Sequence, residues 1–388
     1  EAESIAVAAG VLNDAKRVTI LAGIGAAGAV PEVGELATTL QAPIVVTLKA
    51  KELFDADEHE IGQSGLLGNP ATAEAFAACD VLLMVGTDFP YRNFLPDGKT
   101  VIQIDSRGAH VGRRTPVTHP VVGDAALTLR TLLPLLARRD DTKHLDLARK
   151  AYGAWRELQS HLTDPDYDGT TRGFLRGKVD NPDRRIRPEL LAATIDRHAA
   201  EDAIFTGDTG MSTVWLSRFV RMTGGRRMIG SFNLGSMANA MPQALGAQAL
   251  DRDRQVISVS GDGGLSMLMG DLITAVSHQL DVTVVVFDNG RLGMVKLEME
   301  QVGLPEFGTV LHNPDFAAVA EAIGMRGIRV TDPHEVDGAV AEALAHRGPV
   351  LLDVLTNPEE IAIPGRPKLE QGWGFAIAKS KEFLVSPE

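Results

Sequence analysis

The sequence predicts an α/β fold made of two doubly wound parallel-sheet domains. Short runs rich in valine, isoleucine and leucine alternate with alanine-rich stretches of helical composition from residue 18 to about 136, and again from about 187 onward. This alternation is typical of parallel strands joined by helices. Between the two blocks, a charged helix-like stretch precedes a segment rich in Asp, Gly, Pro and Arg. We therefore predict domains over 1–137 and 187–388, joined by a helix and linker over 138–186.

The strands of both blocks follow from their buried, β-branched composition. The first block opens with a helix, expected over 4–15. Its clearest strands are expected at 18–23, 43–48, 80–86 and 100–105, and those of the second block at 203–208, 255–262, 282–289, 327–330 and 349–355. The residues after these strands matter most, because open parallel sheets bind ligands at the carboxyl ends of their strands.

Composition favours small-molecule partners. The net charge of −13 over 388 residues opposes attraction to nucleic acid. The single cysteine, Cys79, excludes an internal disulfide and a multi-cysteine metal site; it indicates a reducing cytoplasm, and we expect it to be buried. The sequence shows neither a secretory signal nor a run of apolar residues long enough to span a membrane. Because the first residue is Glu1, we expect a fragment, a processed product or a shortened form of a longer protein.

A glycine-rich turn follows the first strand. Gly23, Gly25 and Gly28 form a G-x-G-x-x-G pattern between a strand and a helix, which indicates either a phosphate-binding loop or a tight turn. A nicotinamide cofactor would also need an acidic residue after the second strand. The sequence has Lys49 and Lys51 there, so a simple NAD-dependent dehydrogenase is disfavoured.

Three further segments of the first block are candidate ligand sites because of their positions near strand ends. They are Ser64, Gly65, Leu66 and Leu67; Thr87, Asp88, Phe89, Pro90 and Tyr91; and Asp105. Glycine turns suit a phosphate chain, and an acid suits ribose or adenine. Each segment taken alone is more typical of an ordinary loop than of a ligand site.

The sharpest motif lies in the second block. Asp262, within a G-D-G-G sequence, ends one predicted strand, and Asn289 ends the next. Carboxylate and amide oxygens are ligands that suit Mg²⁺. Gly263 and Gly264 would let the backbone approach a diphosphate. A lone G-D-G would indicate only a capped turn, but the asparagine at this spacing favours a cation site.

This G-D-G motif and its distant asparagine resemble the motif of thiamine diphosphate enzymes. The resemblance implies that Asp262, Asn289 and the backbone carbonyl of Arg291 bind Mg²⁺, although Asp288 stands where the family usually has a first asparagine. It also implies that Gly235 presents its carbonyl to the aminopyrimidine and that Met237 is an apolar wedge beneath the cofactor. The full set of implied contacts is Gly235, Ser236, Met237, Asp262, Gly263, Gly264, Asn289, Gly290, Arg291, Leu292, Gly293, Met294 and Val295.

The likeness extends over most of the chain. SGLLGN, GTDFPYR, VIQID, GSMANAMPQALGAQ and AIPGRPKLEQGWGF resemble the family of pyruvate oxidase and quinone-dependent pyruvate dehydrogenase. In that family the central domain binds FAD and the C-terminal domain binds thiamine diphosphate. The resemblance therefore makes the three segments of the first block FAD contacts: Ser64–Leu67, Thr87–Tyr91 and Asp105.

The implied reaction is oxidative decarboxylation of pyruvate to acetate and CO₂, with electrons passing through FAD to a quinone or another acceptor. The family's activating glutamate lies in an N-terminal pyrimidine-binding domain, and only about 17 residues of this sequence precede its first predicted strand, at 18–23. We therefore expect the catalytic acid outside this chain, and a chain inactive by itself. A homodimer or homotetramer is implied, with at most weak peripheral contact with the inner face of the membrane.

Two other functions stay open. An acetolactate synthase-like carboligase would share both cofactors, and a non-catalytic fragment would retain only cofactor binding. Met294 departs from the quinone-type relatives, which tend to place an aromatic residue there. The acidic stretch 298–300 is expected on a solvated helix face. Trp373 is expected to cover a neighbouring subunit or to pack on the surface.

Overall fold

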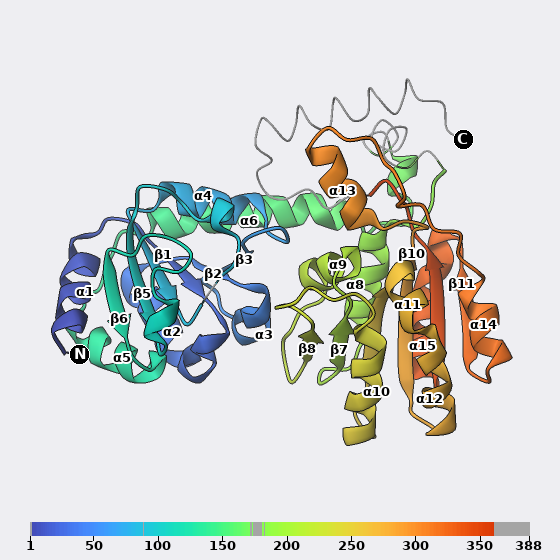
Figure 1. Cartoon of the computed structure of the whole chain (residues 1–388). Helices are drawn as coiled ribbons and strands as arrows, with labels where there is room; N and C mark the ends of the chain where they lie inside the picture. Colours follow the sequence, from blue (N-terminus) through green and yellow to red (C-terminus); the bar gives the residue numbers. More distant parts are fainter. Residues whose placement is uncertain (1, 88, 171–172, 174–180, 182, 361–388) are drawn as a thin grey trace. The chain divides into compact units, whose positions relative to one another are not determined.

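A computed structural model describes residues 2–87, 89–170, 173, 181 and 183–360 (Figure 1). The chain divides into two compact units, with the boundary after Glu157. This boundary falls inside helix α6 (Lys143–His161) and within the segment that the sequence assigns to a helix and linker. Asp88 and Trp373, both named from the sequence, lie outside the described residues.

The first unit is a six-stranded sheet in which every neighbouring pair is parallel, in the order β3-β2-β1-β4-β5-β6. This is the doubly wound order in which the chain starts at the centre and winds to both edges. Its strands are β1 (Val18–Ala22), β2 (Ile44–Val46), β3 (Glu60–Gln63), β4 (Val81–Val85), β5 (Thr100–Asp105) and β6 (His119–Val122).

Helices cover both faces of this sheet. Ile20 of β1 packs in a core with residues of α1 (Ala2–Asp14), α2 (Val30–Leu40) and α5 (Ala125–Leu132). The next residue, Leu21, points to the other face and packs with α4 (Pro70–Ala78) and α6. Successive strand residues face opposite sides, so a strand buried on both faces is apolar throughout. The predicted helix at 4–15 corresponds to α1.

The second unit is also an all-parallel six-stranded sheet, in the order β11-β12-β10-β9-β7-β8. Its strands are β7 (Ile204–Gly207), β8 (Arg227–Gly230), β9 (Val256–Gly261), β10 (Val282–Asp288), β11 (Arg326–Val330) and β12 (Val350–Leu355). Its main helices are α8 (Pro188–His198), α9 (Met211–Phe219), α10 (Ala240–Leu250), α11 (Asp262–Leu268), α12 (Leu272–Ser277), α13 (Gly293–Gln301), α14 (Phe316–Ala322) and α15 (Val336–Ala345). The predicted pair of doubly wound parallel sheets is confirmed.

The sequence analysis missed three strands, β3, β6 and β8, and all three lie at sheet edges. Their sequences, EIGQ, HPVV and RMIG, mix charged residues, glycine or proline with apolar ones. An edge strand has one unpaired side and is partly solvated, so it does not need a continuous apolar run. Composition therefore marks the central strands and passes over these edges.

Two smaller expectations concern the burial of Cys79 and the length of apolar helices. Cys79 is buried, as expected, its thiol donates to the Phe76 carbonyl at 3.2 Å, and burial raises its pKa to about 11. Within the described ranges, none of the helices combines the length and the hydropathy needed to cross a membrane.

The glycine turn after β1 packs against the turn after β4. Gly23 donates its N–H to the Val85 carbonyl and Gly25 donates to the Gly86 carbonyl, both at 2.9 Å. A Cβ on Gly25 would lie 2.8 Å from Cα of Gly86, whereas one on Gly28 would meet nothing within 4 Å. Close backbone packing therefore explains the first two glycines of the pattern and leaves the third free of that requirement.

This difference predicts unequal effects for two substitutions in one short 3₁₀ helix, Ile24–Ala29. Gly25→Ala should lower the free energy of unfolding by roughly 1–3 kcal/mol, because the added methyl group forces two backbones apart. Gly28→Ala is the matched control and should be neutral or stabilising by up to about 1 kcal/mol. Urea denaturation followed by circular dichroism measures both; equal losses would show that packing on Gly86 is unimportant.

Candidate functional site

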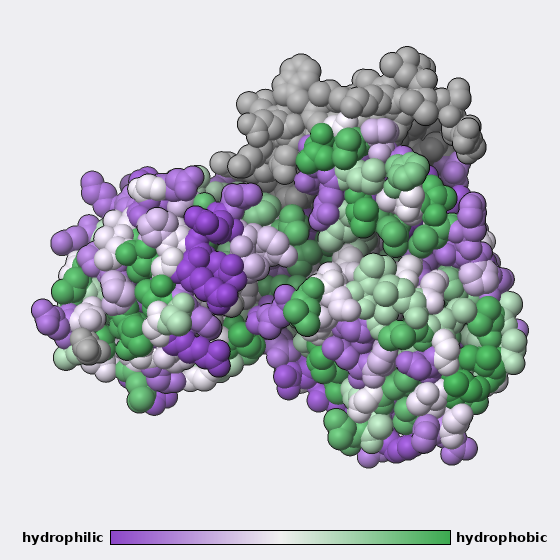
Figure 2. All heavy atoms as spheres, viewed as in Figure 1, coloured by the Kyte–Doolittle hydropathy of each residue, from purple (hydrophilic) through white to green (hydrophobic). Residues whose placement is uncertain are grey.

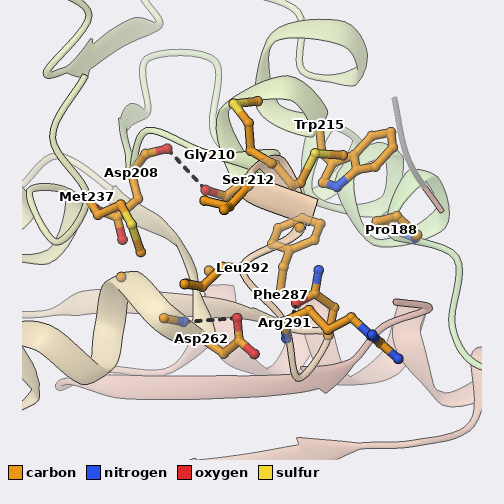
Figure 3. Close-up of a pocket in the computed structure, with 18 of the residues that line it drawn as sticks. Pro188, Asp208, Gly210, Ser212, Trp215, Met237, Asp262, Phe287, Arg291 and Leu292 are labelled. Carbon is orange, nitrogen blue, oxygen red and sulfur yellow. Dashed lines mark hydrogen bonds between the residues drawn. The ribbon is translucent and has the colours of Figure 1, made fainter. Parts of the chain in front are cut away.

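A cavity of about 270 Å³ opens at the carboxyl edge of the second sheet. The segments after β7, β9, β10 and β12 all contribute to its wall, as does the start of α8. Figure 3 shows Asp208 and Met237 on one side of this cavity, with Leu292 between Met237 and Arg291 and with Trp215 near Pro188. The location agrees with the general position of ligand sites in open parallel sheets.

Most residues that the sequence assigns to the diphosphate cofactor lie around this one cavity. They are Gly235, Met237, Asp262, Gly263, Gly264, Asn289, Arg291, Leu292, Gly293, Met294 and Val295. Ser236 and Gly290 are outside its lining. The Ser236 hydroxyl donates to the Met237 carbonyl, and Gly290 lines an adjacent cavity of about 320 Å³ that also touches Asn289 and Arg291.

Strand pairing brings Asp262 and Asn289 to the same edge. β9 and β10 are parallel neighbours with Gly261 opposite Phe287, so the residues that follow each strand emerge together. Asp262 is only 2% exposed, and one of its oxygens accepts the Gly263 N–H at 2.9 Å. The Asn289 side-chain oxygen accepts the Arg291 N–H at 2.9 Å, which fixes the turn after β10. The predicted juxtaposition of the two strand ends is confirmed.

Burial dominates the electrostatics of Asp262. Loss of solvent raises the pKa of its carboxyl to about 6; a hydrogen bond from Asn313 opposes the increase and the nearby Asp288 adds to it. A bound cation at this carboxylate would offset the cost of keeping the charge buried. Asp262 is therefore suited to hold a cation in a largely dry site.

Two glycines keep the cavity open at the start of α11. A Cβ on Gly263 would lie 2.7 Å from Cδ2 of Leu292 and 3.2 Å from Cε of Met237. A Cβ on Gly264 would overlap the carboxylate of Asp208. Neither position accepts a side chain without displacing part of the wall, so these glycines bring backbone directly to the cavity surface.

Asp208 is a site residue that the sequence analysis passed over. It follows β7 and lines the cavity, its carboxylate accepts the Ala240 N–H at 2.9 Å, and burial raises its pKa. It thereby joins the end of β7 to the start of α10, the helix that follows Gly235 and Met237. The rule that ligands lie at carboxyl ends of strands could have found it, since AIFTGD was already predicted as a strand.

Helix α13 presents different side chains to two environments. Met294, Val295 and Glu298 line the cavity, whereas Lys296 and Glu300 are buried, at 1% and 0% exposure. The expectation of a solvated face for 298–300 is therefore wrong for Glu300. Tertiary packing overrides the polar sequence, and the buried Lys296 lies within ion-pair distance of the buried Glu300 carboxylate.

The buried charges around Lys296 form a cluster that anchors α13. The Lys296 ammonium lies 2.8 Å from Glu359, 3.8 Å from Glu306 and 4.0 Å from Glu300. The Arg291 guanidinium also pairs with Glu306 and lies 3.8 Å from Glu359. The cluster therefore ties the turn after β10 to the loop after α13 and to the residues after β12.

Another set of cavity residues comes from segments that carry no motif. Pro188, Thr209, Gly210, Met211, Ser212, Trp215, Phe287, Thr356, Asn357 and Glu360 also line it. Glu360 and Asp168 both pair with the buried Arg187, which precedes α8. These residues lie far apart in the sequence, so local patterns give no indication that they share a site.

In the first unit, two of the three candidate segments meet. A Cβ on Gly65 would lie 3.0 Å from the Tyr91 ring and 3.1 Å from the Phe89 ring, so the turns after β3 and β4 touch. Thr87 and Ser64 are buried beside them. Asp105 ends β5, accepts the Arg107 N–H at 2.8 Å and lies 3.6 Å from a ring nitrogen of His110.

The donor set at the cavity determines which metals it suits. The described residues contain no group of three or more His, Cys, Asp and Glu side chains placed to hold a metal ion. The set predicted from the sequence is of another kind, with one carboxylate, one amide oxygen and one backbone carbonyl. Such hard oxygen donors, completed by water or phosphate oxygens, suit Mg²⁺.

Comparison with known families agrees with this geometry. Residues 208–354 match the thiamine pyrophosphate enzyme C-terminal TPP binding domain, and residues 5–132 match the thiamine pyrophosphate enzyme central domain. The chain belongs to the thiamine pyrophosphate enzyme family. The cavity-lining residues from Asp208 to Glu298 fall within the matched C-terminal domain of that family. Thiamine pyrophosphate is the thiamine diphosphate named above.

Individual thiamine pyrophosphate enzymes resemble the chain over most of its length. YdaP of Bacillus subtilis, named only as containing thiamine pyrophosphate, is 37% identical over 98% of this chain and 64% of its own length. Pyruvate oxidase of Lactiplantibacillus plantarum is 30% identical over 88% of this chain and 55% of its own length. An acetolactate synthase large subunit of Corynebacterium glutamicum is 29% identical over 92% of this chain and 57% of its own length. The chain thus spans 55–64% of the length of these relatives.

Asp353 gives a pH dependence that can be measured without any ligand. It lies on β12 at 0% exposure, its carboxylate accepts from Arg329 at 2.7 Å, and burial raises its pKa from 3.8 to about 7, with a further contribution from Asp288. A raised pKa in the folded state stabilises the fold below about pH 4, and this contribution is lost as pH rises through about 7.

The free energy of unfolding of the ligand-free chain should therefore fall between about pH 4 and pH 7. Asp353→Asn removes the titrating group, so its unfolding free energy should vary less over that range. Asp253→Asn, at an exposed position, is the control and should keep the wild-type dependence. Urea denaturation at several pH values measures this; identical slopes for wild type and Asp353→Asn would exclude Asp353 as a source.

Proposed function

We propose that the chain binds thiamine diphosphate and Mg²⁺ in the cavity of the second unit, binds FAD in the first unit, and takes part in oxidative decarboxylation of pyruvate to acetate and CO₂ with a quinone as electron acceptor. The observation that carries the proposal is the convergence of Asp262, Asn289 and Met237 on one cavity. Because the chain spans only part of its relatives, the activity belongs to the whole protein.

The residues present fit the diphosphate and its cation. Asp262, the Asn289 side chain and the Arg291 carbonyl supply oxygens of the type that Mg²⁺ prefers. Gly263 and Gly264 leave room for phosphate oxygens at the start of α11. Met237, whose methyl group borders the same space as Leu292, is placed as an apolar support for the rings of the cofactor.

The remaining wall would orient the substrate and exclude water. Trp215, Phe287 and Met294 supply apolar surface, and Glu298 places a carboxylate at the cavity. Bound thiamine diphosphate supplies the electron sink for loss of CO₂ from a 2-keto acid. Exclusion of water strengthens the interaction of the carboxylate of Asp262 with a cation, because a less polar surrounding screens charges less.

The proposed FAD contacts are the turns at Ser64–Leu67 and Thr87–Tyr91, together with Asp105. Contact between the first two turns supports a joint role, and the position of Asp105 at the end of β5 suits ribose or adenine.

In the proposed reaction, pyruvate and water give acetate, CO₂, two electrons and two protons. FAD held by these turns would supply the acceptor for both electrons and both protons, and a quinone reduced to a quinol would be their final acceptor.

We further propose a cytoplasmic homo-oligomer. Figure 2 shows hydrophobic and hydrophilic residues intermixed over the visible faces. The second unit also has large apolar side chains in solvent, including Phe307 at 84% exposure and Leu234. Exposed apolar residues of this size favour association with a second copy of the chain.

Acetolactate synthesis is the second candidate, and a specific observation favours it. Relatives named as acetolactate synthases match this chain at about the same identity as pyruvate oxidase, 29% against 30%. Met294, which lines the cavity, is an unbranched side chain in place of the aromatic residue expected of a quinone-type enzyme. An acyl group in this cavity could then be passed to a second keto acid instead of being oxidised.

Calorimetry should detect thiamine diphosphate binding that requires Mg²⁺. Asp262→Ala should abolish the binding, because it removes the charged ligand, whereas Asp253→Ala, in an exposed turn, should leave it unchanged. Thermal unfolding of both variants serves as the folding control. Binding by Asp262→Ala equal to that of the wild type would overturn the assignment of the cavity.

The oxidase and synthase functions are separated by the fate of the flavin in the full-length enzyme. We expect pyruvate, under anaerobic conditions, to bleach the flavin absorption band, and a quinone to restore it with one acetate formed per turnover. Acetolactate formation with the flavin still oxidised would favour the synthase instead. Absorption spectra and product analysis of the same samples provide both measurements.

A further inference from the structure

One side chain connects the two strand ends that carry the candidate cation ligands. Asn313 lies just before α14, and its amide nitrogen donates to Asp262 Oδ2 and to Asp288 Oδ1, each at 2.7 Å. Both acceptors are buried. Asp262 follows β9, and Asp288 is the last residue of β10, so a single amide group holds two neighbouring strands at the point where the cavity begins.

The backbone around Asn313 is fastened to the same turn. Leu292 donates its N–H to the Thr309 carbonyl, and Leu311 donates to the Gly290 carbonyl, both at 2.8 Å. Arg291 and Val310 form an antiparallel bridge between these bonds. Residues 309–313 therefore run along the turn after β10 as a short strap, and Asn313 is the end of the strap that reaches Asp262.

The charges explain why an amide suits this position. Two carboxylates face the same group, so only a hydrogen-bond donor is stabilised there, and the amide nitrogen has one hydrogen for each of them. The amide supplies these bonds without adding charge. The need for a hydrogen-bond donor at position 313 is stricter with Asp288 than with the asparagine expected from the family motif, because Asp288 is a second buried anion beside Asp262.

We propose that Asn313 is a positioning residue that fixes the carboxylate of Asp262 for the bound cation, with Asp288 as its second anchor. This inference rests on the proposed function. Residues that orient a metal ligand from behind typically contribute a factor of about 10–100 to metal affinity. Asn313 acts through Asp262 and needs no contact with the cation or with the substrate.

The test measures the Mg²⁺ concentration that half-saturates thiamine diphosphate binding, followed by calorimetry with the full chain. Asn313→Ala should raise this concentration about 10–100-fold, while the affinity for the cofactor at saturating Mg²⁺ changes little. A merely structural loss would weaken both quantities together. His312→Ala, at the exposed neighbouring position, is the matched control and should behave as the wild type.

Substitutions that change only charge sharpen the test. Asn313→Asp keeps the shape, but its ionised carboxylate has no hydrogen to donate, so it loses both hydrogen bonds to Asp262 and Asp288, as Asn313→Ala does. Asp288→Asn keeps an oxygen that can accept from Asn313 and removes the like charge. The Mg²⁺ concentration that half-saturates binding should therefore stay within about 3-fold of the wild-type value, well below the increase expected for Asn313→Ala.

The outcomes separate the two proposals. Failure of the wild-type chain to bind thiamine diphosphate with Mg²⁺ would refute the proposed function. Normal wild-type binding with an unchanged Mg²⁺ requirement in Asn313→Ala would refute only the role of Asn313. If Asn313→Ala is unfolded, Asn313→Ser replaces it. The shorter serine has one donor hydrogen and cannot bond both carboxylates, so it should still raise the Mg²⁺ requirement, and an unchanged requirement in that variant overturns the inference.

Discussion

The parallel pairing of β9 with β10 is the constraint from which the candidate site follows. It sets Gly261 opposite Phe287, so the next residues of both strands, Asp262 and Asp288–Asn289, emerge at one edge. A shift in this register would separate the carboxylate from the amide, whatever the local sequence. The buried apolar strands thus determine which polar side chains can act together.

Distant segments then hold these strand ends in place. Residues 309–313 run along the turn after β10, and Asn313 reaches both Asp262 and Asp288. Lys296 and Arg291 join the same turn to Glu306 and Glu359. Ion pairs removed from water contribute little net stability compared with apolar packing, but removing the partners of the buried Lys296 leaves a buried charge and is costly. Their value here is in fixing geometry around the cavity.

The same organisation serves both units and leaves the overall reaction open to variation. In each unit a parallel sheet gathers turns at the carboxyl ends of its strands, and in the first unit Gly25 and Gly86 pack backbone against backbone. Relatives that match the chain in sequence bear the names pyruvate oxidase and acetolactate synthase large subunit. Under the proposed function, the acceptor of the acyl group would depend on a few wall positions, such as Met294, more than on the fold.

The sequence by itself determined the central strands, the two doubly wound sheets and the pairing of Asp262 with Asn289. These depend on short-range patterns: apolar runs buried on both faces, and a spacing that one helix and one strand fill. Only the tertiary structure decided three edge strands (β3, β6 and β8), the burial of Glu300, the place of Asp208 in the cavity and the bridge made by Asn313. Those features depend on contacts between segments such as 262 and 313, and no local pattern encodes which distant residue a side chain will meet.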